Sequence, residues 1–228
     1  MEAIVLAGGF GTRLREVVPD VPKPMAQVAG RPFLEILLSD LASKGFKRVV
    51  LSLGYKSEVI IAHLGVRFAG LEIAYVVEDA PLGTGGAVRL ATSECLDDHV
   101  SIFNGDTFLD LEANAVESLW QERRRPIIVA REVDDTARYG RLLVESGRLA
   151  GFTEKGVSGP GLINAGCYVL GVHQLDAWPP NTPFSLEADY FANAVTAAPV
   201  DVFETSGHFI DIGVPDDYQR AQTELAGR

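Results

Sequence analysis

Short apolar-rich runs alternate with amphipathic stretches along the first 130 residues. Runs of strand length, typical of buried strands, occur at 3–6, 49–53, 71–77, 100–103 and 127–130. Helices are predicted between them at 32–44, 57–64, 84–94 and 112–124. The first of these begins at Pro32, carries leucines at three- and four-residue spacing, and is followed by Gly45. This alternation predicts an α/β fold with a mostly parallel central sheet and helices on both faces.

The pattern changes after residue 130. Strands are predicted at 140–145, 148–154, 162–170, 200–204 and 208–212, with Ser146-Gly147 as a hairpin turn. Helices are predicted at 187–197 and 216–225. This second part is expected to be small and mixed, with antiparallel strands. Because no linker or repeat separates the parts, we expect one domain over 1–228, divided into 1–130 and 131–228.

Composition excludes several classes of protein. The 228 residues include 47% hydrophobic residues, which is too many for a disordered chain, and no apolar stretch approaches the ~20 residues of a membrane span. The net charge of −11 argues against nucleic-acid binding. The start MEAIVLAGG lacks the features of a signal peptide, and Cys95 and Cys167 have no metal-site or disulfide spacing. A reduced, cytoplasmic protein is expected.

A glycine-rich segment follows the first predicted strand. It reads Ala7-Gly8-Gly9-Phe10-Gly11-Thr12-Arg13-Leu14 and contains no acidic residue. Three glycines in four positions let the backbone approach a ligand and direct N–H groups at an anion. The segment is neither a Walker loop nor the dinucleotide fingerprint. By itself it is better explained as a simple glycine-rich turn.

Lys23 supports the phosphate interpretation of that segment. It lies between Pro22 and Pro24, which restrict the backbone around it. A lysine between two prolines can be a plain loop feature. Held about ten residues after a glycine-rich anion loop, its ammonium is better explained as a second phosphate contact.

These two motifs together resemble the signature of the sugar-1-phosphate nucleotidyltransferases. Five further blocks fit the same family in order: 81–86 (PLGTGG), 104–106 (NGD), 154–155 (EK), 164–166 (NAG) and 209–213 (FIDIG). The resemblance implies a Rossmann-like fold similar to that of the A-type glycosyltransferases. It also implies transfer of a nucleotidyl group from a nucleoside triphosphate to a sugar 1-phosphate, with release of pyrophosphate.

Within this family the chain most resembles guanylyltransferases that use D-glycero-α-D-manno-heptose 1-phosphate. It is also similar to mannose-1-phosphate guanylyltransferases and to uridylyltransferases of muramate or glucose 1-phosphate, so the sugar and the base remain open at this point. Two other classes are weighed. A non-catalytic sensing subunit would be expected to have lost motif residues, which are intact here. A glycosyltransferase would usually carry an Asp-x-Asp motif where this chain has Asn104-Gly105-Asp106.

The resemblance also assigns roles to individual residues. The expected catalytic residues are Arg13, Lys23 and Lys155. The expected nucleotide-binding residues are Leu6, Ala7, Gly8, Gly9, Gly11, Thr12, Glu78, Gly83 and Thr84. The expected sugar-binding residues are Asn104, Gly140, Glu154 and Asn164. For Glu154 and Lys155, a pair of solvated surface charges is the plain alternative.

Asp106 and Asp211 are the expected ligands of Mg²⁺, the expected cofactor. Each follows a predicted strand, and Mg²⁺ needs only one or two carboxylates together with substrate phosphates. The plain alternatives are a turn residue for Asp106 and a helix cap for Asp211. Asp110 is a weaker candidate. The expected partners are the two substrates, with no nucleic acid and no membrane; the oligomeric state is open, a homodimer included.

Glu78 bears on the choice of base, because the resemblance places it at the nucleobase. Guanine presents two adjacent N–H donors, which one carboxylate accepts together. Uracil and thymine present a single N–H flanked by oxygens, which suits an amide better. Glu78 therefore favours GTP.

Overall fold

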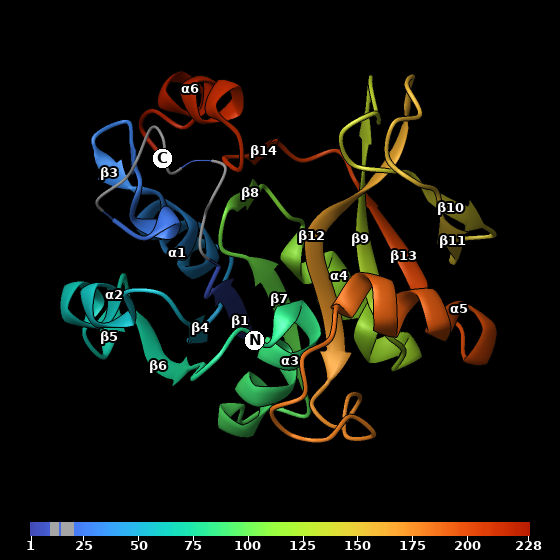
Figure 1. The fold of residues 1–228 in the computed structure, drawn as a ribbon, viewed down its shortest axis with the longest axis horizontal. Helices are drawn as coiled ribbons and strands as arrows, with labels where there is room; N and C mark the ends of the chain where they lie inside the picture. Colours follow the sequence, from blue (N-terminus) through green and yellow to red (C-terminus); the bar gives the residue numbers. More distant parts are fainter. Residues whose placement is uncertain (10–13, 15–20) are drawn as a thin grey trace.

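The computed structural model describes residues 1–9, 14 and 21–228. Its main feature is a ten-stranded sheet in the order β10-β11-β13-β9-β12-β7-β1-β4-β6-β5 (Figure 1). Two further pairs, β14-β8 and β2-β3, lie outside this sheet. The strands are β1 Glu2–Ala7, β2 Gln27–Val28, β3 Arg31–Pro32, β4 Arg48–Leu53, β5 Arg67–Phe68, β6 Leu71–Val77, β7 His99–Asn104, β8 Thr107–Leu109, β9 Ile127–Val133, β10 Leu142–Glu145, β11 Arg148–Phe152, β12 Gly161–Gly171, β13 Asp201–Thr205 and β14 Phe209–Asp211.

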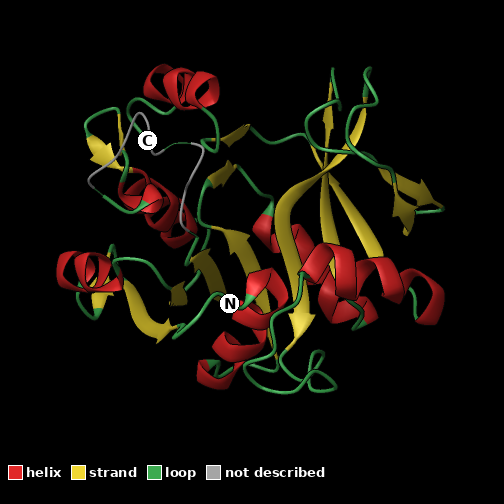
Figure 2. Cartoon of the chain, in the orientation of Figure 1, coloured by secondary structure: helices red, strands yellow, loops and turns green. Residues whose placement is uncertain are grey.

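Helices pack on both faces of this sheet (Figure 2). The α-helices are α1 Phe33–Ser43, α2 Ser57–Leu64, α3 Gly83–Ala91, α4 Ala113–Arg123, α5 Ala192–Ala197 and α6 Pro215–Glu224. Short 3-10 helices occur at Lys23–Met25 (η1) and Thr92–Glu94 (η2), and a π-helix, Leu186–Phe191 (η3), runs directly into α5. The predicted α/β architecture is confirmed.

Three apolar clusters form the core of the described residues, and two of them cover the faces of the large sheet. One joins the sheet to α1, α2 and α4, with Leu38, Ile60 and Trp120 among its members. The other joins the opposite face to α3 and η3, through Val88 and Phe191. Because both faces of the central strands are covered, these strands are apolar on both sides, which is why they read as nearly unbroken apolar runs in the sequence.

The carboxyl ends of the central strands define the edge where chemistry is expected. Strands β1, β4, β6 and β7 are parallel, with Leu6 opposite Asn104 and Leu53 opposite Val77. The residues that follow these strands therefore meet at one edge of the sheet. They include Gly8 after β1, Glu78 after β6 and Asp106 after β7.

The structure differs from the predicted pattern in strand order and in detail. Strand β12 runs antiparallel between β7 and β9, so β9 is not the direct neighbour of the parallel strands. The helix predicted at 187–197 is a π-helix followed by α5, and the short pairs β14-β8 and β2-β3 were not predicted as pairs. The β14-β8 pair joins segments that are far apart in the chain, and β2-β3 is a local hairpin whose two-residue strands are too short to leave a periodic pattern. Among the described residues, the longest apolar helix is too short to span a bilayer.

Candidate active site

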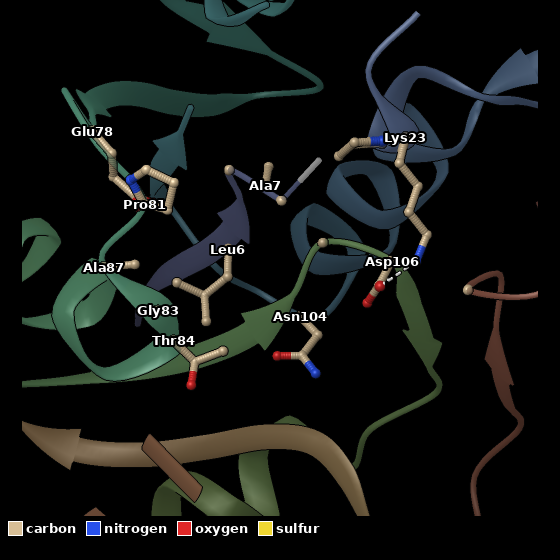
Figure 3. A pocket seen from close by; sticks show the side chains of 15 residues that line it. Leu6, Ala7, Lys23, Glu78, Pro81, Gly83, Thr84, Ala87, Asn104 and Asp106 are labelled. Carbon is tan, nitrogen blue, oxygen red and sulfur yellow. Dashed lines mark hydrogen bonds and ion pairs between the residues drawn. The ribbon is translucent and has the colours of Figure 1, made fainter. Parts of the chain in front are cut away.

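A cavity of about 390 Å³ lies at the carboxyl ends of β1 and β7 (Figure 3). Its wall is built from strand ends, from the start of α3 and from η1. The lining residues are Leu6, Ala7, Gly8, Gly9, Lys23, Pro24, Glu78, Pro81, Gly83, Thr84, Ala87, Asn104, Gly105, Asp106 and Gly213. The first predicted strand, the proline-flanked lysine and the 81–86, 104–106 and 209–213 blocks thus converge on one space.

Gly8 allows the close packing at one end of this cavity. A Cβ at Gly8 would lie 2.7 Å from Oε1 of Glu78, and a Cβ at Gly54 would lie 2.7 Å from the carbonyl oxygen of Gly8. Side chains at either position would push these segments apart. The backbone of the β1 loop can therefore approach the Glu78 carboxylate directly.

The Glu78 carboxylate is held by two donors. The Leu82 N–H donates to Oε2 at 2.9 Å, and the Ser52 hydroxyl donates to Oε1 at 3.4 Å. Burial raises the pKa of Glu78, while these two hydrogen bonds oppose the shift. Each carboxylate oxygen accepts more than one hydrogen bond, so the group retains acceptor capacity toward the cavity.

The start of α3 forms the next part of the wall. Gly83 has a φ of +69°, and a Cβ there would lie 2.6 Å from the carbonyl oxygen of Phe184. Only glycine fits this close contact without strain. The neighbouring Thr84 accepts a hydrogen bond from the Leu186 N–H at 2.8 Å and donates to Glu187 at 2.7 Å.

At the other end of the cavity, the Lys23 ammonium forms an ion pair with the Asp106 carboxylate (Figure 3). Strand β14 pairs with β8, placing Asp211 opposite Thr107, and the Ile212 N–H donates to the Asp106 carbonyl at 2.9 Å. A Cβ at Gly213 would lie 2.6 Å from Oδ1 of Asp211 and 3.2 Å from Nζ of Lys23. One short strand pair thus brings both predicted metal ligands beside the same lysine.

A bulge in β12 adjoins the cavity at Asn104. The register of β12 against β9 shifts between Asn164 and Tyr168, and Gly166 has a φ of +70°. A Cβ at Gly166 would lie 2.7 Å from Nδ2 of Asn104. Bulges commonly redirect side chains near functional sites, and this one brings Gly166 against Asn104, while Asn164 itself is not among the residues that line the cavity.

Comparison with known proteins identifies the family. The nucleotidyl transferase family matches residues 2–228. The chain belongs to the nucleotidyl transferase family. It is 37% identical over 226 residues to the D-glycero-α-D-manno-heptose 1-phosphate guanylyltransferase of Aneurinibacillus thermoaerophilus, covering 99% of this chain and 98% of that one. It is 33% identical to a mannose-1-phosphate guanylyltransferase of Mycobacterium tuberculosis, of which it spans 64%.

A solved structure supports this family assignment. HddC from Yersinia pseudotuberculosis superposes with a TM-score of 0.89 at 35% identity, over 98% of this chain and 99% of that one. A second structure of HddC, in complex with GMP-PN, has a TM-score of 0.87. The family expectation drawn from the glycine-rich and proline-flanked motifs is confirmed.

The predicted residues of this nucleotidyltransferase fall into three groups. Most of those expected at the nucleotide line the cavity, as do Lys23, Asn104 and Asp106. Glu154 and Lys155 are exposed after β11, beside Gly140, where an added Cβ would lie 3.8 Å from the Lys155 backbone nitrogen. Arg13, Gly11 and Thr12 lie outside the described residues.

Asp110, the weaker metal candidate, lies elsewhere. Its carboxylate pairs with Lys44 at 3.0 Å and with Arg228 at 3.3 Å, and these cations lower its pKa. Among the described residues, no cluster of three or more His, Cys, Asp or Glu side chains is arranged to hold a metal ion. A metal at Asp106 and Asp211 would therefore take its remaining ligands from substrate oxygens or water, as Mg²⁺ commonly does.

Two residues near the site were not predicted from the sequence. Tyr168 is fully buried in β12, and its hydroxyl donates to Oε1 of Glu187 at 2.7 Å. Glu187 lies at the start of η3, where an acidic residue is fully explained by its favourable interaction with the helix N-terminus. No spacing in the chain signals that it reaches Thr84, 103 residues away.

Proposed function

We propose that the protein transfers a guanylyl group from GTP to a sugar 1-phosphate, with D-glycero-α-D-manno-heptose 1-phosphate as the acceptor. The observation that carries this proposal is a cavity with the Glu78 carboxylate at one end and the Lys23–Asp106 pair at the other. That arrangement suits a nucleotide whose base lies at the carboxylate and whose phosphates lie at the lysine.

The choice of base rests on Glu78. When ionised, its carboxylate can accept the two adjacent N–H groups of guanine. The guanylyltransferase names of the relatives and the GMP-PN complex of HddC support the same base. The acceptor rests on the nearly full-length similarity to a heptose 1-phosphate guanylyltransferase.

In the proposed reaction, an oxygen of the sugar 1-phosphate attacks the α-phosphorus of GTP in line, and pyrophosphate leaves. The attacking phosphate is already ionised, so no general base is required. Catalysis then consists of positioning and charge neutralisation. Lys23, Arg13 and Lys155 are proposed to supply positive charge near the phosphates.

Asp106 and Asp211 are proposed to hold Mg²⁺. The β8-β14 pairing brings two carboxylates from distant segments together, and carboxylate oxygens are the ligands that Mg²⁺ prefers. When bound, the ion would neutralise charge on the triphosphate. Lys23 would hold the Asp106 carboxylate in place and contribute its own charge to the phosphates.

We further propose a division of the single domain. Residues 1–130 provide the nucleotide contacts Leu6, Ala7, Gly8, Gly9, Gly11, Thr12, Glu78, Gly83 and Thr84. Residues 131–228 provide most of the sugar contacts, Gly140, Glu154 and Asn164, with Asn104 at the boundary between them. Cys95 and Cys167 are free thiols, which supports a reducing cytoplasmic location.

Pyrophosphate release tests this function. The protein is incubated with Mg²⁺, each of the four common nucleoside triphosphates, and heptose, mannose, glucose and muramate phosphates. Release only with GTP and the heptose 1-phosphate is the expected result. Release with mannose 1-phosphate alone would show that the proposed acceptor is wrong. Release with UTP alone would show that the proposed base is wrong. Binding without turnover for every pair would favour a sensing subunit.

A further inference from the structure

A chain of side-chain hydrogen bonds links α3 to the bulge of β12 through Glu187. Oε2 of Glu187 accepts from the hydroxyls of Thr84 at 2.7 Å and Ser185 at 2.9 Å. Oε1 accepts from the Tyr168 hydroxyl at 2.7 Å. One carboxylate therefore receives three hydroxyl groups, from the cavity wall, from the segment before η3 and from β12.

The donor and acceptor groups of these side chains set the direction of the hydrogen bonds. The Tyr168 hydroxyl donates to Glu187, so its single hydrogen points to that carboxylate. Burial and the adjacent carboxylate raise the pKa of Tyr168 well above its ordinary value, so this hydrogen is retained. The Tyr168 oxygen is then left to accept, and Nδ2 of Asn164 donates to it at 2.8 Å.

The orientation of the Asn164 amide follows from that direction. Because Nδ2 faces Tyr168, Oδ1 lies on the other side, where it accepts the Gly166 N–H at 3.0 Å. Both ends of the amide are thus specified by the protein. One hydrogen on Nδ2 and one lone pair on Oδ1 remain for a ligand.

The same carboxylate orients Thr84. The Thr84 hydroxyl accepts the Leu186 N–H and gives its only hydrogen to Glu187. Toward a ligand in the cavity, Thr84 can therefore only accept. Glu187 thus sets hydrogen-bond polarity on the proposed nucleotide side and on the proposed sugar side together.

We propose that Glu187 is a positioning residue for sugar selectivity, acting through Tyr168 to hold the Nδ2 end of the Asn164 amide in place toward the sugar hydroxyls. The inference rests on the proposed function, in which Asn164 contacts the sugar. The Gly166 N–H holds only the Oδ1 end, so without the Tyr168 contact the Nδ2 end would be free to move away from its position. Discrimination between sugars that differ in the configuration of one hydroxyl would then weaken.

Two variants interrupt the chain with little change in shape. Tyr168→Phe removes the hydroxyl that joins Asn164 to Glu187. Glu187→Gln introduces an amide that can donate to the Tyr168 oxygen, where it would compete with Nδ2 of Asn164. Tyr190→Phe is the matched control, because it removes a hydroxyl outside this chain from a ring packed 5.0 Å from the Phe191 ring.

The kinetic test separates sugar recognition from nucleotide recognition. In Tyr168→Phe and Glu187→Gln, we expect the KM for the sugar 1-phosphate to rise about three- to tenfold, the loss of one hydrogen bond. The KM for GTP should stay within about twofold, and the kcat/KM ratio between the heptose 1-phosphate and glucose 1-phosphate, which has the other configuration at C2, should fall. An unchanged ratio and unchanged sugar KM in both variants would overturn the inference.

A second readout does not depend on turnover. In ¹⁵N-labelled protein, the side-chain NH₂ signal of Asn164, assigned with Asn164→Asp, reports the amide directly. We expect one of its hydrogens to exchange slowly with water in the wild type and in Tyr190→Phe, and quickly in Tyr168→Phe. Equal exchange in all three proteins would refute the positioning role. Absence of pyrophosphate release by the wild type would instead refute the proposed function, while this signal still decides the orientation.

Discussion

The Lys23 ammonium and the Asp106 carboxylate, 83 positions apart in the chain, form an ion pair in the wall of the cavity. Lys23 has little freedom to leave it, since its side chain is only 10% exposed and its backbone lies between two prolines. The pair places a fixed cation beside the carboxylate that we propose as a metal ligand. Loss of either charge should therefore lower the rate of catalysis more than it lowers the stability of the fold.

Asp106→Asn is expected to lower kcat about a hundredfold or more. Removing one group that stabilises developing charge commonly costs about 2.7–4 kcal/mol. The measurement is pyrophosphate release at several Mg²⁺ concentrations, and Lys23→Ala should show a loss of similar size. Asp110→Asn is the matched control, because that carboxylate pairs with Lys44 and Arg228 instead. Near-normal turnover by a folded Asp106→Asn protein would remove Asp106 from the metal site.

Glu78→Gln is expected to reduce the preference for GTP over UTP and dTTP. The amide offers one acceptor and one donor group where the carboxylate offers two acceptors, so it suits uracil and thymine better than guanine. The measurement is kcat/KM for each triphosphate with one sugar 1-phosphate. Glu72→Gln is the control, because Glu72 lies near the start of β6, away from the cavity, and pairs with Arg48. An unchanged selectivity ratio would show that Glu78 does not read the base.

The pH dependence of stability gives a separate test of Glu78. Burial raises the pKa of Glu78 above its ordinary value of 4.5. Protonation of Glu78 therefore favours folding, and its contribution to stability falls as the pH rises from 4.5 through the raised pKa. Glu78→Gln should raise the melting temperature at pH 7 and lose that advantage below pH 4.5, where Glu78 is protonated in both states. The glutamine can still accept the Leu82 N–H and donate to Ser52.

Melting curves at neutral and acidic pH measure this difference. A Glu78→Gln protein that melts lower than the wild type at pH 7 would contradict the expected sign. Such a result would mean that the two donors to Glu78 stabilise its ionised form more than burial destabilises it.

Asp217→Asn tests the contact between α6 and the turn that carries Gly140. Asp217 is buried at 4% exposure, and its carboxylate accepts from Arg138 at 2.7 Å and from Arg220 at 2.8 Å. We expect about 1–2 kcal/mol of lost stability, less than for a fully buried pair because both arginines are about half exposed. Urea denaturation measures this loss.

Asp216→Asn provides the control for that variant. Asp216 lies in the same first turn of α6 and is exposed, so its substitution should change stability by less than about 0.5 kcal/mol. Equal losses in the two variants would show that the charge near the helix N-terminus, and not the ion pair with Arg138, carries the effect.

Much of the site was predictable because its residues follow strands. Leu6, Gly8, Glu78 and Asp106 all lie at or just after the ends of parallel strands, and parallel strands end at one edge of the sheet. Local patterning therefore predicted both the strands and their shared edge. The helix at 187–197 was predicted less well, because a π-helix and an α-helix present the same kind of apolar pattern.

The sequence by itself determined the α/β class, the glycine-rich and proline-flanked motifs, and the residue types needed to bind a nucleotide and a metal. Only the tertiary structure decided that β12 enters the sheet antiparallel beside β7, and that Glu187 lies between Thr84 and Tyr168. The physical reason is the distance along the chain between the residues in contact. Turns and periodicity depend on neighbours a few residues away, whereas these contacts join segments that meet only after the whole core has packed.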